Sequence, residues 1–169
     1  VWFGAEVAPQ RIELIRDPGG ARLPGHFQGG VVRIDAEALK RTAELRRILR
    51  HELTHAVVDS RTAGNCPVWV QEGIAQFLDG TDVVAVDRDL VPLLRLEGPF
   101  ASQDEAARRL AYQESASAVS YLMKRIGRPG LLFIIGRLGE GQPFDRALVE
   151  AGLSYSELQK GWEAALGRR

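Results

Sequence analysis

The chain has 169 residues, of which 45% are hydrophobic and 26% are charged, with 22 basic and 22 acidic side chains. This composition is typical of a globular domain with a sizeable core, and it excludes disordered and fibrous proteins. The net charge of zero argues against nucleic acid as a partner, because such binding depends on a surplus of basic side chains. No apolar run approaches the roughly 20 residues that a transmembrane helix needs.

The first third of the sequence predicts strands. Residues 11–15 alternate polar and apolar side chains, and residues 17–20 have the composition of a turn. A second extended stretch runs over residues 25–34. Its paired glycines, Gly29 and Gly30, indicate a bulge, a tight hairpin or a close approach of another backbone.

The remainder of the chain predicts mainly helices. An apolar stripe from Asp35 to about Asp59 indicates one helix or two, and Pro67 suits the first turn of the next, which ends near Leu78. A short extended piece at 83–86 precedes helical segments near 103–126, 130–138, 143–151 and 155–166. The fold class is therefore α+β, with a small, mostly antiparallel sheet at the N-terminus and a helical C-terminal part, and we expect a single domain over residues 1–169.

The most specific motif is His51-Glu52-Leu53-Thr54-His55, which lies in the strongest helical stripe. Two histidines four residues apart share one face of a helix and can chelate one ion. Glu52 follows His51 and can face a water at the metal without being a ligand. Since the chain has only three histidines, this order seldom arises by chance, and it predicts a zinc site.

A catalytic zinc ion needs three protein ligands and one open position. We expect Glu72, on the following helix, to be the third ligand, with Gly73 allowing this helix to approach the zinc helix closely. His26 is the alternative third ligand, although we favour a position for it on a strand, with its side chain facing the cleft. Cys66 is the single cysteine, so the chain cannot form an internal disulfide. We expect its side chain to pack as a small residue and not to bind the zinc as a thiolate.

These strings resemble a known family. HELTHAVVD followed by WVQEGIAQFLDG is similar to the peptidase MA-like domains of bacteria, which are gluzincin metallopeptidases, and the first string also resembles the thermolysin zinc helix. The likeness extends over most of the chain from about residue 25, including the string Ala111-Tyr112-Gln113-Glu114-Ser115-Ala116. It implies a zincin-like fold and a zinc-dependent peptidase with one Zn²⁺ per chain.

The resemblance also implies roles for individual residues. His51, His55 and Glu72 would bind zinc, and Glu52 would act as general base on a zinc-activated water. An edge strand in zincins pairs with extended substrate, and residues 25–34 suit that strand, with Gly29 and Gly30 at the closest approach.

Three further side chains have candidate roles near the metal. Asp59 and Gln76 each lie one turn beyond a predicted ligand and could orient an imidazole. Tyr112 could donate a hydrogen bond to the developing oxyanion, as a tyrosine does in several gluzincins. Tyr121 is the alternative donor, although its neighbours Leu122 and Met123 favour packing.

The function we expect is hydrolysis of a peptide or protein substrate, with endopeptidase favoured because no acidic amine-anchoring motif is recognised. The alternative is a catalytically inactive zincin-like domain that binds a protein or peptide partner. A chain without a disulfide leaves the compartment open, and bacterial extracytoplasmic placement is the location we favour. Because the sequence begins at Val1, we expect that any signal peptide or flanking domain has been cut away. Specificity and oligomeric state are not predicted.

Overall fold

The three strands in the described part of the chain precede its helices and form one small sheet. A computed structural model describes residues 11–15, 25–82, 90–100 and 104–167, so the predicted turn at 17–20 and extended piece at 83–86 lie outside the described residues. The sheet contains β1 (Arg11–Ile15), β2 (Gly25–Gln28) and β3 (Val31–Asp35), in the order β1-β3-β2. One of its two pairings, β2 with β3, is antiparallel as expected, whereas β1 runs parallel to β3.

The paired glycines form the tight turn between β2 and β3. Gln28 lies opposite Val31 in the ladder, so the turn holds only Gly29 and Gly30, with φ values of +58° and +78°. A two-residue turn with positive φ at both positions strongly favours glycine, because a side chain is strained there. Of the three structures that the sequence left open for this pair, the hairpin is therefore the one observed.

The zinc-motif helix packs on the sheet. The predicted stripe divides into a short 3-10 helix, η1 (Ala36–Lys40), and one long helix, α1 (Thr42–Thr62). On β3 the buried residues alternate, and Val32 and Ile34 pack with Ile48 of α1 in a small core of their own. This core fixes α1 against one face of the sheet.

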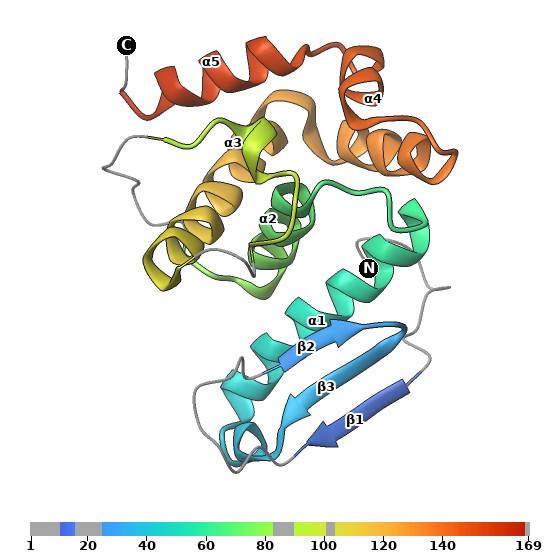
Figure 1. The fold of residues 1–169 in the computed structure, drawn as a ribbon, viewed down its shortest axis with the longest axis vertical. Coiled ribbons are helices and arrows are strands. Elements are labelled where there is room, and N and C mark those ends of the chain that lie inside the picture. Colours follow the sequence, from blue (N-terminus) through green and yellow to red (C-terminus); the bar gives the residue numbers. More distant parts are fainter. Residues whose placement is uncertain (1–10, 16–24, 83–89, 101–103, 168–169) are drawn as a thin grey trace.

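The helical part lies on the other side of α1 (Figure 1). It contains α2 (Val68–Asp79), η2 (Leu93–Leu96), α3 (Glu105–Gly139), α4 (Phe144–Glu150) and α5 (Tyr155–Ala165). Within α3, Gly127 has φ +66° and ψ −179°, so two helices meet there at the predicted boundary. Ser154 and Glu157 form a capping box at the start of α5. The α+β class, with strands before helices, is confirmed.

The closest helix contact in the site region joins α2 to α3. A Cβ added at Gly73 would lie 2.3 Å from the backbone oxygen of Ser115 and 2.4 Å from Cγ2 of Val119, both on α3. The prediction that Gly73 allows an approach to the zinc helix is therefore wrong; this glycine brings α2 against α3. The approach carries Tyr112, at the same end of α3, toward the metal ligands.

A larger core surrounds this contact, with Trp69 of α2, Leu122 of α3 and Trp162 of α5 all buried. Within the described residues, no helix combines the length and the apolar character needed to cross a bilayer.

Candidate metal centre

The two histidines of the motif lie side by side where α1 faces α2. His51 and His55 are one helical turn apart, their ring centroids are 4.7 Å apart, and their planes meet at 79°. Their side chains are 19% and 10% exposed, so both reach the wall of a pocket without being sealed from it. The helix spacing thus produces the shared face that the sequence predicted.

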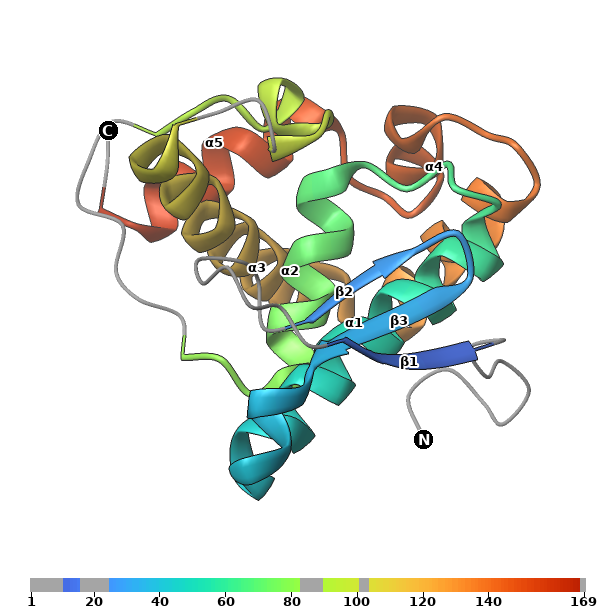
Figure 2. The ribbon, with the colours of Figure 1, turned by 60° about the horizontal axis from the view of Figure 1, so that its bottom comes forward.

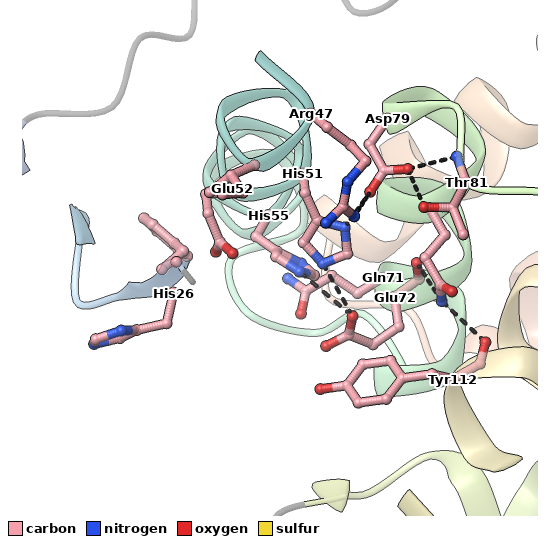
Figure 3. Close-up of a pocket in the computed structure, with 14 residues that line it drawn as sticks. His26, Arg47, His51, Glu52, His55, Gln71, Glu72, Asp79, Thr81 and Tyr112 are labelled. Atoms are coloured by element: carbon pink, nitrogen blue, oxygen red, sulfur yellow. Dashed lines mark hydrogen bonds and ion pairs between the residues drawn. The ribbon is translucent and has the colours of Figure 1, made fainter. Parts of the chain in front are cut away.

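Glu72 reaches the same point from α2. Its Oε2 lies 3.5 Å from Nε2 of His51 and 3.5 Å from Nε2 of His55 (Figure 3). One ligand atom from each of the three residues falls within 4.8 Å of the others. The structure therefore brings together the three side chains that the sequence proposed as ligands.

The arrangement fits a tetrahedral zinc ion. Two ligand atoms at about 2.05 Å from zinc and at the tetrahedral angle lie about 3.3 Å apart, close to the two observed spacings. Oε2 of Glu72 is buried and, among the described residues, has no hydrogen-bond partner of good geometry. A buried carboxylate oxygen seldom lacks a hydrogen-bond partner. A cation between this oxygen and the two imidazoles would supply the missing interaction. Two imidazole nitrogens and one carboxylate oxygen are also a usual zinc donor set.

The charges of the ligands agree with this arrangement. Burial acts to raise the pKa of Glu72, but the two imidazoles outweigh it and lower that pKa to about 2. Burial acts to lower the pKa of His51, yet the hydrogen bond to Asp79 and the negative charge of Glu72 raise it to about 9. The metal-free cluster thus holds a carboxylate and a protonated imidazole, so a cation must displace a proton from His51.

His51 is oriented by a carboxylate that the sequence analysis did not select. Its Nδ1 donates to Oδ2 of Asp79 at 2.9 Å, which leaves Nε2 directed at Glu72. Asp79 is the last residue of α2, and its Oδ1 accepts hydrogen bonds from the backbone N–H, at 2.7 Å, and the hydroxyl of Thr81. Such a carboxylate fixes both the tautomer and the direction of a metal-binding imidazole.

Neither of the two residues predicted for that role orients an imidazole. Asp59 is one turn beyond His55 on α1, but Nδ1 of His55 has no hydrogen-bond partner among the described residues. Gln76 is buried and donates to the backbone oxygens of Glu72, at 3.3 Å, and Tyr112, at 2.9 Å. Gln76 therefore joins the ligand helix α2 to α3 and holds no imidazole.

Glu52 faces the sheet side of the same pocket. It is buried, its carboxylate accepts a hydrogen bond from the backbone N–H of Phe27 on β2, and burial raises its pKa. A Cβ added at Gly25 would lie 2.6 Å from Cγ2 of Ile48, 3.1 Å from Cγ of Glu52 and 3.2 Å from its Oε1. The strand backbone thus passes close to the Glu52 side chain, and a larger residue in place of Gly25 would have to displace the side chain of Ile48.

The strand meets the pocket at Gly25, His26 and Phe27. Gly29 and Gly30 form the turn beyond them and do not line the pocket; a Cβ at Gly29 would have no atom within 4 Å. Their role in substrate binding stays a prediction that their position does not support. The ring of His26 points away from the other two histidines (Figure 3), which leaves Glu72 as the third member of the cluster.

Tyr112 extends from α3 beside Glu72, with its hydroxyl on the same side as that carboxylate (Figure 3). Its ring packs edge-on against Phe100 at 5.5 Å between centroids. Burial and the charge of Glu72 raise the pKa of Tyr112 to about 12, so its hydroxyl keeps its proton. Tyr121 does not face the site, because its hydroxyl lies against Gly161 of α5.

A pocket of about 380 Å³ lies between β2, α1, α2 and α3, and it is lined by the site residues described above: His51, Glu52, His55, Glu72, Asp79 and Tyr112. The edge strand β2 packs against α1 (Figure 2), and its residues 25–27 line this pocket together with residues of α2. Cys66 is not part of it: it lines a different pocket, and burial raises the pKa of its thiol to about 12, which disfavours a thiolate.

Comparison with known families identifies the class of protein. The model of the peptidase MA superfamily matches residues 26–167, nearly the whole chain. The chain belongs to the peptidase MA superfamily. The resemblance seen in the zinc strings is thus confirmed, and it extends through the helical part that supplies Tyr112. Searches of curated proteins and of solved structures give no match. Membership supports a metallopeptidase-like domain with a His51, His55 and Glu72 group that could hold a metal ion.

Proposed function

We propose that this chain is a zinc-dependent hydrolase of peptide bonds, of the gluzincin type. The observation that carries the proposal is the position of Glu72, 3.5 Å from both His51 and His55, in a pocket that also holds the buried Glu52. A zinc ion held by the three ligands would polarise the scissile carbonyl and acidify the attacking water.

The protein's own groups have separate tasks in that reaction. Glu52 would accept a proton from the attacking water and pass it to the leaving amine, and its raised pKa suits a group that must take up and release a proton. Tyr112, still protonated at neutral pH, would donate to the charge that develops on the carbonyl oxygen. Asp79 would keep His51 in the tautomer that presents Nε2 to the metal.

The substrate we propose is an extended peptide segment. Among the described strands β2 lies at the edge of the sheet and pairs only with β3, and its residues 25–27 line the pocket. An edge strand offers unpaired backbone groups to which a peptide can add as a further strand. This placement would lay the scissile bond between the strand and the zinc ligands, and it suits internal cleavage of a chain, as in an endopeptidase.

The deciding experiment combines metal analysis with one nearly isosteric substitution. We expect about one zinc per chain, lost in both His51→Ala and Glu72→Ala. Glu52→Gln should keep the zinc and the fold but lower peptide turnover at least a hundredfold, because only the proton acceptor is removed. Glu44→Gln, on the same helix but outside the pocket, is the matched control and should retain wild-type turnover.

Two outcomes would contradict the proposal. Turnover of Glu52→Gln within about threefold of wild type would exclude the assigned general base. If wild type and variant both bind zinc but neither hydrolyses a broad peptide library, the domain is a binding module and not a peptidase.

A further inference from the structure

A second cavity adjoins the metal pocket along α3. This cavity has a volume of about 400 Å³ and shares three lining residues with the metal pocket: Gln76, Thr81 and Tyr112. Tyr112 therefore stands between the two spaces. A peptide whose scissile bond lies at the metal ligands can place a neighbouring residue or its own end in the second cavity.

Arg108 is the charged side chain placed to receive such a group. It lies one helical turn before Tyr112 on α3, so the two side chains share a face of the helix. Arg108 is half-buried and lines the second cavity. Its positive charge is near enough to act on the Tyr112 hydroxyl, where it opposes the larger effects of burial and of Glu72 on the pKa.

The charge of Arg108 is not neutralised by the described residues. Asp82, Glu105 and Arg109 also line the cavity, but all three are exposed, and no ion pair within 4 Å is described between Arg108 and a carboxylate. Arg137, further along the same helix, is different: its guanidinium binds Glu140 at 2.6 Å and Glu150 at 2.7 Å. Of these two half-buried arginines, only Arg108 has no described carboxylate partner, and it is the one beside the site.

We propose that Arg108 binds a carboxylate of the peptide substrate in the cavity beyond Tyr112, so that the protein selects acidic peptides. The inference rests on the proposed function, because it assigns the substrate of the same site. A guanidinium pairs with a carboxylate through two parallel N–H···O bonds, which gives both affinity and orientation. The carboxylate can come from an Asp or Glu side chain or from the C-terminus of the peptide.

The test measures binding to zinc-loaded Glu52→Gln, which should hold peptides without cleaving them. Three pools of random eight-residue peptides, acetylated and fluorescently labelled, serve as probes. The first is neutral with an amidated C-terminus, the second has a free C-terminal carboxylate, and the third is amidated with one internal Glu. We expect at least one acidic pool to bind tenfold or more tightly than the neutral pool.

The pool that gains affinity identifies the source of the carboxylate. Adding Arg108→Gln should remove the preference while leaving the melting temperature and the affinity for the neutral pool unchanged. Arg125→Gln, an exposed arginine on α3 outside both pockets, is the matched control for net charge and should keep the preference.

Equal affinity for all three pools, no binding of any pool, or a preference that survives Arg108→Gln would each overturn the proposal. Hydrolysis of the neutral pool by the wild-type protein is measured in parallel. A protein that cleaves this pool but ignores carboxylates disproves only the role of Arg108. One that binds acidic pools through Arg108 but cleaves nothing disproves only the proposed activity.

Discussion

The two sides of the metal pocket carry different kinds of information. The side formed by the sheet and α1 presents its chemistry in one short string, with His51, Glu52 and His55 within five residues. The helical side contributes Glu72, Asp79 and Tyr112 from two helices and over 40 residues. Local spacing explains the first side, whereas the second depends on how α2 and α3 pack.

The packing of the two ligand helices differs in the same way. The buried residues of α1 include Glu52, Thr54 and His55, whose polar groups need partners. The buried residues of α2 are mostly apolar, among them Trp69, Val70 and Ile74, and they belong to the large core. We infer that α2 is the fixed wall of the site and that α1 depends more on the metal for its order. Four predictions test this contrast, from the largest effect to the smallest.

Removing the hydroxyl supplied by the helical side should have the largest effect. We expect Tyr112→Phe to lower peptide turnover by about a hundredfold, the usual cost of losing one donor to the developing oxyanion. Zinc content and melting temperature should stay at wild-type values, since the ring still packs on Phe100. Tyr121→Phe, with its hydroxyl near Gly161, should retain full turnover. Unchanged turnover in Tyr112→Phe would show that the hydroxyl takes no part in the reaction and that Tyr112 serves only in packing.

Removing the charge behind His51 should weaken the metal site. We expect Asp79→Asn to lower the zinc affinity by between ten- and a hundredfold, because His51 loses its charged acceptor and the amide that replaces it can also present an N–H. Competition with a chelator of known affinity measures the change. Asp59→Asn is the control, and the larger loss in that variant would show that the orienting carboxylate had been misassigned.

Separating α2 from α3 should reduce stability. Gly73→Ala places a Cβ against the Ser115 backbone, and we expect it to lower the free energy of unfolding by about 2 kcal/mol. Gly136→Ala, at an exposed helix position with no atom within 4 Å of the added Cβ, should instead raise that free energy by up to about 1 kcal/mol. Denaturant unfolding compares the two, and equal effects would disprove the close approach.

A proton and a zinc ion should compete for His51, which links α1 to the carboxylates of α2. The folded-state pKa of His51, about 9, is above its ordinary value of 6.5, so its protonated form stabilises the metal-free protein below pH 6.5. That contribution is lost as the pH rises through about 9. Zinc affinity should therefore increase from pH 6.5 to 9, by up to tenfold per pH unit, with release of a proton. Titration calorimetry in buffers of different ionisation enthalpy measures the release, and a flat profile would contradict it.

The sequence predicted most of the fold and the grouping of His51, His55 and Glu72, because these depend largely on short-range patterns. Helix periodicity places His51 and His55 on one face, and the Ser154 capping box is local. The residues that hold the cluster in place were harder to predict from the sequence. Asp79 follows Glu72 by two helical turns, which places it on the ligand face, but next to Gly80 it indicated only the end of a helix. Gln76 acts on backbone oxygens, which no side-chain pattern predicts.

Gly25 shows a further limit of sequence reasoning. An isolated glycine in a strand signals close approach of some other group, but the pair Gly29-Gly30 is the stronger signal of the same kind. Only the three-dimensional structure shows that the pair forms the turn and that Gly25 lies against Glu52.

The turn at Gly29 and Gly30 lies outside the metal pocket, yet it sets the alignment of β2 along β3 and so determines which backbone N–H reaches Glu52. Successive residues of a strand direct their groups to opposite sides, so one inserted residue in this turn would place His26 or Gln28 where Phe27 is now. Glu52 would then lose its backbone donor, and the space above it would no longer be kept by a glycine. The length of this two-residue turn therefore decides which backbone N–H contacts Glu52, the proposed general base.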